Sequence, residues 1–338
     1  MNHLKVLFIS ILGIGAILVG YGLHDHIVKV KAARLEHAVA PAAYFPSGAI
    51  WTQNVSHAPV DPHSSTIISW LAGAGGWGNN NRMQVDFGYR VLQADAHTPF
   101  VPFRKGNPFY SPDSDNISTF PLPSAGGNYQ CDTSQNDCPL IVVDRGHGKL
   151  YEAYAANYAE NVLTATFVAV WDLNRVYPPS GRGDQCTSAD AAGLPIAPLL
   201  FNADELAAGH IDHAIRLVLP NPRIRAHVFV HPATHAGQPR GPVDAPPMGA
   251  RFRLKASFDM SKLTPAAQVV ARAMQKYGMF LSDGGNIALT AQGDQDTVAK
   301  YADMDFTPHD LTDLKVTDFE VVEMGRPIQL TDDCVRNR

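Results

Sequence analysis

Charged residues are scarce in this chain of 338 residues, and neither sign is in large excess. They make up 17% of the sequence, with 27 Lys and Arg against 32 Asp and Glu, for a formal net charge of −5. Because no basic excess is present to neutralise phosphates, we do not expect binding to nucleic acid. The hydrophobic fraction of 45% is that of a folded protein and excludes a disordered chain.

Motifs that identify a reaction are also missing. The chain has no phosphate-binding P-loop, no G-x-S-x-G, no H-E-x-x-H and no C-x-x-C pair. No repeat, heptad or low-complexity tract is present either. What the chain does have is 27 Gly and 25 Pro, which favour a turn-rich, β-containing fold over a helical bundle. No cofactor is expected.

The amino terminus carries an uncharged apolar stretch over 6–23, which follows a short flank of residues 1–5. A stretch of this length predicts a transmembrane anchor or a cleaved signal segment. We favour the anchor, because the stretch ends in GYGLHDH, a poor cleavage site. The sequence therefore predicts a linker over 24–44 and one globular domain over 45–338. This domain is expected outside the cytoplasm, in the periplasm or at the cell surface, and tethered to the membrane.

Four cysteines fit this location, because exported chains meet an oxidising environment. Cys131 and Cys138 enclose a short polar loop and are expected to pair with each other. Cys186 and Cys334 would then join the tail to the body of the domain. The alternative is four free buried thiols.

Strand patterns outnumber helix patterns along the body. Strands are expected over 140–144, 149–158, 163–173, 211–220, 226–232 and 250–257. Helices are expected over 202–209, with Asn202 as its N-cap, and over 264–278, with Thr264 as its N-cap. The two kinds do not alternate regularly. We therefore predict a mainly β fold with a few helices, a single domain resembling an antiparallel β-sandwich.

Histidines are the first candidates for chemistry, because imidazole exchanges protons near neutral pH. His213 falls on a strand position otherwise occupied by Ile and Leu, and 226–232 could form the neighbouring strand. His213 and His231 are therefore predicted to meet as an acid–base pair. One alternative is a metal site that adds His235. The other is loop histidines without a catalytic role.

Carboxylates and their neighbours form the second set of candidates. Asp172 or Asp190 is expected to orient the histidines or to supply an acid. Glu152 and Tyr154 would line a substrate groove, together with His235 and Asp283. Arg251 could clamp an anionic group of the substrate. Each of these residues also has a purely structural interpretation, such as a cap, a turn or a solvated strand face.

Several longer segments resemble a family of exported bacterial surface proteins. They are KLYE (149–152), WDLN (171–174), TSADAAGLPIAP (187–198), IDHAIRL (211–217), PPMGARFRLKASFD (246–259) and MQKYGMFLSDGGN (274–286). The resemblance covers about 45–325 and implies export and a single-domain body. It implies no activity, because that family has none established, so no catalytic residue carries over.

Together these observations predict an exported polysaccharide hydrolase or lyase that uses His and Asp side chains for acid–base chemistry. Its partner would be a carbohydrate polymer or another cell-envelope substrate. Two alternatives are a non-catalytic glycan-binding module of the cell surface and a metal-dependent hydrolase.

Overall fold

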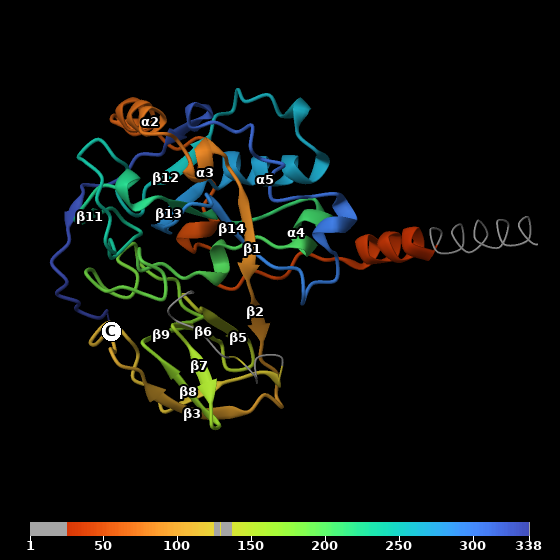
Figure 1. The fold of residues 1–338 in the computed structure, drawn as a ribbon, viewed down its shortest axis with the longest axis vertical. Helices are drawn as coiled ribbons and strands as arrows, with labels where there is room; N and C mark the ends of the chain where they lie inside the picture. The colour runs from red at the N-terminus through yellow and green to blue at the C-terminus, as the bar shows by residue number, and fades with distance from the viewer. Residues whose placement is uncertain (1–25, 125–128, 130–136, 338) are drawn as a thin grey trace, which may run out of the picture.

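The described part of the chain folds as one domain built mainly of β-strands, as the sequence predicts. The computed structural model describes residues 26–124, 129 and 137–337. Figure 1 shows a larger lobe above a smaller one, with β1 (Val85–Tyr89) and β2 (Val91–Gln93) passing from the first to the second. Among the described residues, no sheet closes into a barrel.

A six-stranded sheet organises the larger lobe. Its pairs β1–β14 and β10–β13 are parallel, whereas β12 is antiparallel to both of its neighbours. All five residues of the central strand β10 are buried, which explains its nearly continuous apolar sequence. In order across the sheet, the strands are β1, β14 (Leu289–Gln292), β10 (Ile215–Leu219), β13 (Met279–Gly284), β12 (Arg251–Leu254) and β15 (Phe319–Val321).

Two four-stranded sheets form the smaller lobe. The pairs β2–β5 and β3–β8 are parallel and the other pairs are antiparallel. One sheet has the order β2, β5 (Leu140–Asp144), β6 (Lys149–Tyr154) and β9 (Phe167–Asp172). The other has the order β4 (Thr119–Pro121), β3 (Phe100–Lys105), β8 (Val162–Ala165) and β7 (Asn157–Ala159). The pairing is thus mixed, not purely antiparallel.

The sheet that contains β5 lies between two hydrophobic cores. Ile141 and Val143 on one face of β5 pack in the main core, whereas Leu140 and Val142 on the other face pack in a smaller core within the lower lobe. Alternate residues of a strand point to opposite faces, so β5 is apolar on both. The two lobes are therefore joined by a sheet buried on both faces.

Helices are few and short. The longest, α5 (Pro265–Lys276), packs against β12 and begins at Thr264, whose hydroxyl caps it as predicted. Asn202 caps α4 (Ala203–Ala208) in a capping box with Glu205, also as predicted. Further α-helices are α2 (Ser64–Gly73) and α3 (Gly78–Asn81). The 3-10 helices are η1 (Ile50–Thr52), η3 (Ala197–Leu199), η4 (Asn221–Arg223), η5 (Met260–Lys262), η6 (Tyr301–Met304) and η7 (Val316–Asp318).

The strand expected over 211–220 begins only at Ile215, so His213 precedes it. The segment 226–232 contributes the short strand β11 (Val228–Phe229), which pairs with β16 (Ile328–Gln329). β10 instead lies between β14 and β13, two strands that come more than fifty residues later in the chain. The prediction that 211–220 and 226–232 form neighbouring strands is therefore wrong.

One of the two expected disulfides is confirmed. Cys186 and Cys334 are bonded across a sequence separation of 148 residues, and this bond fastens the carboxyl-terminal tail to the loop before Asp190. Cys138 is also disulfide-bonded. Its expected partner, Cys131, lies outside the described residues.

The apolar stretch over 6–23 likewise lies outside the described residues. From residue 26 onward, no helix of the described chain is long and apolar enough to cross a membrane. Residues 26–37 are helical. Arg34 in this helix donates from Nε to Oδ2 of Asp303 over 2.7 Å, so the stretch expected as a linker contacts the domain.

Replacing both members of the Cys186–Cys334 disulfide by serine should destabilise the domain. A crosslink that closes so long a loop contributes about 2–5 kcal/mol, mainly by restricting the unfolded chain. We expect the double variant to lose that much free energy of unfolding in urea, followed by tryptophan fluorescence. Thiol titration should show that the bond at Cys138 stays intact, and an unchanged unfolding midpoint would contradict the prediction.

Candidate functional site

Three segments distant in sequence converge on the guanidinium group of Arg216. Arg216 lies on β10 and donates to both carboxylate oxygens of Asp190, from Nε over 3.1 Å and from Nη2 over 2.8 Å. Nη2 also donates to Oδ2 of Asp283, at the end of β13, over 2.7 Å. The guanidinium carbon lies 5.2 Å from the ring centre of Tyr89, at the end of β1. We call these four residues the Arg216 cluster.

Arg216 is the one charged residue in the buried strand β10, and 2% of its side chain is exposed. Burying a cation costs several kcal/mol unless acceptors surround it. Here Nη1 donates to the Thr290 hydroxyl over 3.1 Å, so each of its three nitrogens has an acceptor. The cation is therefore held in one position.

Asp190 is held by its own loop and by β13. Its backbone N–H donates to the Ser188 hydroxyl over 2.9 Å, and its carbonyl accepts from the Gly193 N–H. Ala192 in turn donates its N–H to the carbonyl of Ser282, the residue before Asp283. The loop is thus fastened beside β13, which brings the carboxyl groups of Asp190 and Asp283 to the same guanidinium.

The two aspartates differ in exposure. The Asp190 side chain is fully buried, whereas 29% of the Asp283 side chain is exposed. Burial, and then the charge of Asp190, raise the pKa of Asp283 to about 7, although Arg216 and the N–H of Gly284 oppose the shift. Burial also raises the pKa of Asp190, again against Arg216. Below about pH 7 the pair therefore holds a proton on Asp283, the aspartate that solvent can reach.

Two residues of the smaller lobe, Tyr154 at the end of β6 and Asp137, interact electrostatically with this cluster. The Tyr154 hydroxyl donates to Oδ1 of Asp137 over 3.5 Å. Burial raises the pKa of Tyr154, and the charges of Asp137 and Asp283 raise it further. Burial likewise raises the pKa of Tyr89 to about 12, with a smaller contribution from Asp137. The charge of Asp283 therefore acts on a tyrosine of each lobe, Tyr89 and Tyr154.

Glu152, which we expected to line a groove, is instead completely buried. Its carboxylate accepts the N–H groups of Ile196 and Ala197 over 2.8 and 2.9 Å, and Nε1–H of Trp171 over 2.9 Å. Burial raises its pKa to about 7 despite these donors. Glu152 therefore positions the segment that follows the Asp190 loop and has no open path to a substrate.

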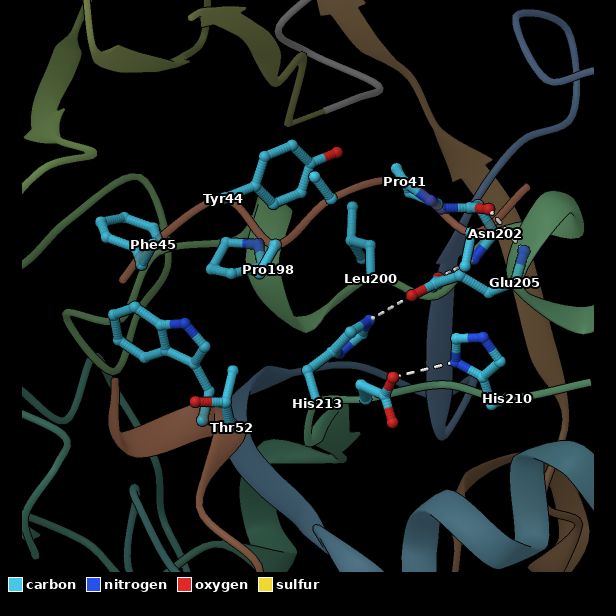
Figure 2. A pocket seen from close by; sticks show the side chains of 15 residues that line it. Pro41, Tyr44, Phe45, Thr52, Pro198, Leu200, Asn202, Glu205, His210 and His213 are labelled. Carbon is cyan, nitrogen blue, oxygen red and sulfur yellow. Dashed lines mark hydrogen bonds and ion pairs between the residues drawn. The ribbon is translucent and has the colours of Figure 1, made fainter. Parts of the chain in front are cut away.

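His213 lies elsewhere, on the wall of a cavity of about 270 Å³. Figure 2 shows it between Leu200 and Thr52, with its ring pointing toward Glu205. Its Nδ1 donates to the carbonyl of Ala214 over 2.8 Å, and Nε2 lies 3.2 Å from Oε1 of Glu205. Burial lowers the pKa of His213, but the charge and the hydrogen bond of Glu205 more than offset this and raise it. Both ring nitrogens are thus engaged as donors, and His213 is a poor general base.

The other predicted histidines are scattered, which corrects the predicted pair. His231 contacts Asp184 through Nε2 over 2.8 Å, and His235 contacts the carbonyl of Ala191 and the carboxylate of Asp332. Since 226–232 does not pair with β10, nothing brings His231 next to His213. No group of three metal-ligating side chains occurs in the described chain, so the alternative of a metal site at His213, His231 and His235 is not supported.

Asp172 and Arg251 also have structural partners. Asp172, the last residue of β9, accepts from Lys149 Nζ and from the N–H of Asn174, each over 3.0 Å. Arg251 is 7% exposed and donates to the backbone carbonyls of Tyr277, Gln53 and Ile50. Its predicted role as a substrate clamp is therefore not supported, because its donors are already used within the fold.

Of the nine residues that the sequence suggested for a site, the structure brings Asp190 and Asp283 together on Arg216, and the charge of Asp283 raises the pKa of Tyr154. Sequence reasoning missed Arg216, Tyr89 and Asp137. Arg216 had a recognisable signal, because a single Arg inside the apolar run IRLVL must find acceptors when that strand is buried. Nothing in the sequence marked Tyr89 or Asp137.

A scan against models of protein families and searches of curated proteins and of solved structures return no significant match. The resemblance to exported bacterial surface proteins stays a prediction. The function must therefore be argued from the geometry of the site.

The raised pKa of Asp283 predicts how stability changes with pH. An aspartate of the unfolded chain titrates near pH 4, whereas Asp283 of the folded protein titrates near pH 7. Between these two values the folded protein binds the Asp283 proton more tightly than the unfolded chain does. The stabilisation is present at low pH and lost as the pH rises through about 7. We therefore expect Asp283→Asn to gain stability relative to the wild type between pH 5 and pH 8, measured by urea unfolding.

Asp172→Asn serves as the control of opposite sign. The N–H of Asn174 and the ammonium of Lys149 lower the pKa of Asp172, so its contribution is present at neutral pH and lost on acidification. This variant should lose, not gain, stability relative to the wild type as the pH rises. Parallel stability curves for Asp283→Asn and the wild type would contradict the assignment of the proton to Asp283.

Proposed function

We propose that the protein is an exported enzyme that hydrolyses a carbohydrate polymer, with Asp283 as its general acid. One observation carries this proposal. Asp283 is a partly exposed carboxyl group whose pKa lies near 7 and whose position is fixed by a buried Arg216–Asp190 pair. A carboxylic acid that keeps its proton at neutral pH and is open to solvent is what protonation of a glycosidic oxygen requires.

Glycoside hydrolysis needs a second carboxylate that remains ionised. Asp190 is too deeply buried for this role, so we assign it, with Arg216, to positioning Asp283. Asp137 is exposed, its Oδ1 accepts from the Tyr154 hydroxyl over 3.5 Å, and the charges of Asp137 and Asp283 both raise the pKa of Tyr154. We assign Asp137 as the general base.

The reaction then balances within this pair. The bond between the anomeric carbon and the glycosidic oxygen breaks, and the Asp283 proton passes to the departing oxygen. The oxygen of a water molecule bonds to the anomeric carbon, and the proton of that water passes to Asp137. Solvent returns the two carboxyl groups to their starting states.

Tyr89 and Tyr154 favour hydrolysis over elimination. Both rings are half-buried and subject to the charge of Asp283, and we assign to them the aromatic contacts with a sugar ring. A lyase needs a base that removes a proton from carbon, and a tyrosine is a common choice. Burial raises the pKa of both phenols, which makes either a reluctant base at neutral pH.

The location outside the cytoplasm is part of the same proposal. It rests on the apolar stretch over 6–23 and on the Cys186–Cys334 disulfide, a bond that persists in oxidising compartments. A substrate in the cell envelope follows from that location.

The test measures release of reducing ends from purified peptidoglycan and from soluble neutral and uronate-containing polysaccharides. The wild type should cleave at least one of these polymers. Asp283→Asn should lower the rate by about 100-fold or more, which is the usual contribution of a general acid. Asp137→Asn should also lose most activity. Asp172→Asn, which removes a surface carboxylate outside the cluster, should retain it.

The pH profile provides an independent check on the same enzyme. Because Asp283 must be protonated to act, the rate should fall as the pH rises through about 7. Binding of a polymer without cleavage would instead identify a glycan-binding module. Full activity in Asp283→Asn would remove the proposed acid, and an unsaturated product with ultraviolet absorbance would identify a lyase.

A further inference from the structure

The cavity that contains His213 is separate from the acid–base chemistry proposed above. A strap of residues 40–45 forms one wall, and the segment after η3, together with α4, forms another. Figure 2 shows Tyr44 and Phe45 of this strap over Pro198, with Asn202 and Glu205 at the opposite end. None of the residues in the Arg216 cluster lines it.

We propose that this cavity binds one neutral pyranose unit, with Trp51 and Asn202 as hydrogen-bond donors to its hydroxyl groups. Four features of the cavity support this proposal, and none of them involves Asp283. They are its aromatic lining, its two unpartnered donors, its paired ionisable side chains and its volume.

Aromatic side chains line one end of the cavity. Phe45 and Trp51 meet edge to face with ring centres 4.8 Å apart, so their orientations are fixed by each other. Tyr44 lies beside them on the strap. Rigid aromatic faces of this kind pack against the C–H faces of a sugar ring.

Two buried donors have no acceptor among the described residues. Trp51 and Asn202 are each 4% exposed. The Asn202 side-chain oxygen accepts the N–H of Glu205, but its amide nitrogen is left without a partner in the described chain, as is Nε1 of Trp51. Both nitrogens are accessible to solvent. Among the described residues, the only side-chain nitrogen or oxygen atoms that are fully buried and lack a hydrogen-bond partner are Arg182 Nε and Arg336 Nε. Two separate hydroxyl oxygens of a ligand, one near each end of the cavity, would serve as acceptors for Trp51 Nε1 and the Asn202 amide nitrogen.

The ionisable side chains that line the cavity contact one another in pairs. His213, whose pKa is raised, faces the carboxylate of Glu205, and His210 contacts Asp212 through Nδ1 over 2.9 Å. Oε2 of Glu205 already accepts the N–H of Asn202. With no unpaired cation to attract an acid group, the cavity favours a neutral ligand over a uronate.

The volume also limits the ligand. At about 270 Å³, the cavity is slightly smaller than typical pockets for drug-sized molecules. It has room for a single sugar ring and not for an oligosaccharide, so any chain attached to the sugar would have to leave through the open side.

Arg145, in the turn after β5, holds the strap in place. Its Nη2 donates to the carbonyl of Ala42 over 2.6 Å, its Nη1 donates to that of Ala43 over 3.3 Å, and its guanidinium carbon lies 5.2 Å from the Tyr44 ring centre. The strap wall therefore depends on a residue of the smaller lobe. Loosening this contact should weaken sugar binding without removing any donor to the ligand.

The experiment titrates the full chain with D-glucose, D-galactose, N-acetyl-D-glucosamine and D-glucuronate, using saturation-transfer NMR and calorimetry. At least one neutral sugar should bind, and glucuronate should not. Trp51→Phe keeps the aromatic ring, and Asn202→Ser keeps an N-cap acceptor for α4. Each variant removes one donor and should weaken binding about threefold to tenfold, as expected for one neutral hydrogen bond.

Two further variants serve as comparison and control. Arg145→Ala should weaken binding, whereas Arg272→Ala, on the exposed face of α5, should not change it. Asp283→Asn should bind the sugar as the wild type does, so failure of the proposed hydrolysis leaves this result unaffected. Methyl glycosides distinguish the end unit of a glycan, which they mimic, from a free sugar. The proposal is overturned if no neutral sugar binds, if glucuronate binds best, or if both donor variants bind like the wild type.

Discussion

The buried guanidinium of Arg216 is the contact on which the rest of the molecule depends. It lies on the central strand of the six-stranded sheet, and its ion pairs with Asp190 and Asp283 join a long loop to the end of β13. Tyr89 stacks on it from β1, the strand that continues through β2 into the smaller lobe. A cation in such a place must be surrounded by acceptors, because the cost of desolvation is large. The loop before Asp190 is further held by the Cys186–Cys334 bond, which ties the carboxyl-terminal tail to the same region.

The ion pairs of Arg216 and the solvent exposure of Asp283 also explain why Asp190 and Asp283 differ in protonation. Asp190 and Asp283 share one guanidinium, but only Asp283 reaches solvent. Since one cation cannot fully stabilise two neighbouring anions at a buried site, the more weakly paired carboxyl group retains its proton to higher pH. Because both aspartates neutralise Arg216, Asp283 is left as a partly exposed carboxyl group with a raised pKa. The proposed hydrolysis uses this Asp283 carboxyl group as its general acid and needs no histidine.

The cavity beside His213 differs from the Arg216 cluster in the groups that it offers to a ligand. Its charges are paired within the fold, and what remains is a set of aromatic faces and unused donors. One wall is supplied by the strap at 40–45, which follows directly on the helix of residues 26–37. Arg145 fastens this strap from the smaller lobe, and Arg34 fastens the helix to Asp303 in the larger one. The strap and the helix that precedes it thus contribute to the cavity in which we propose that a sugar binds.

Local patterns were enough to determine the β-rich character, the caps at Asn202 and Thr264, the buried strand over 140–144 and the Cys186–Cys334 bond. Each depends on neighbouring residues or, for the disulfide, on a small number of possible partners. The strand order could not be predicted in this way. β10 pairs with β13 and β14, and this choice moved His231 away from His213 and brought Asp283 to Arg216. Exposure, and with it the protonation of Asp283, was also decided only by tertiary structure. A carboxyl group acquires a raised pKa from the groups that surround it in space, and those groups come from strands far apart in the sequence.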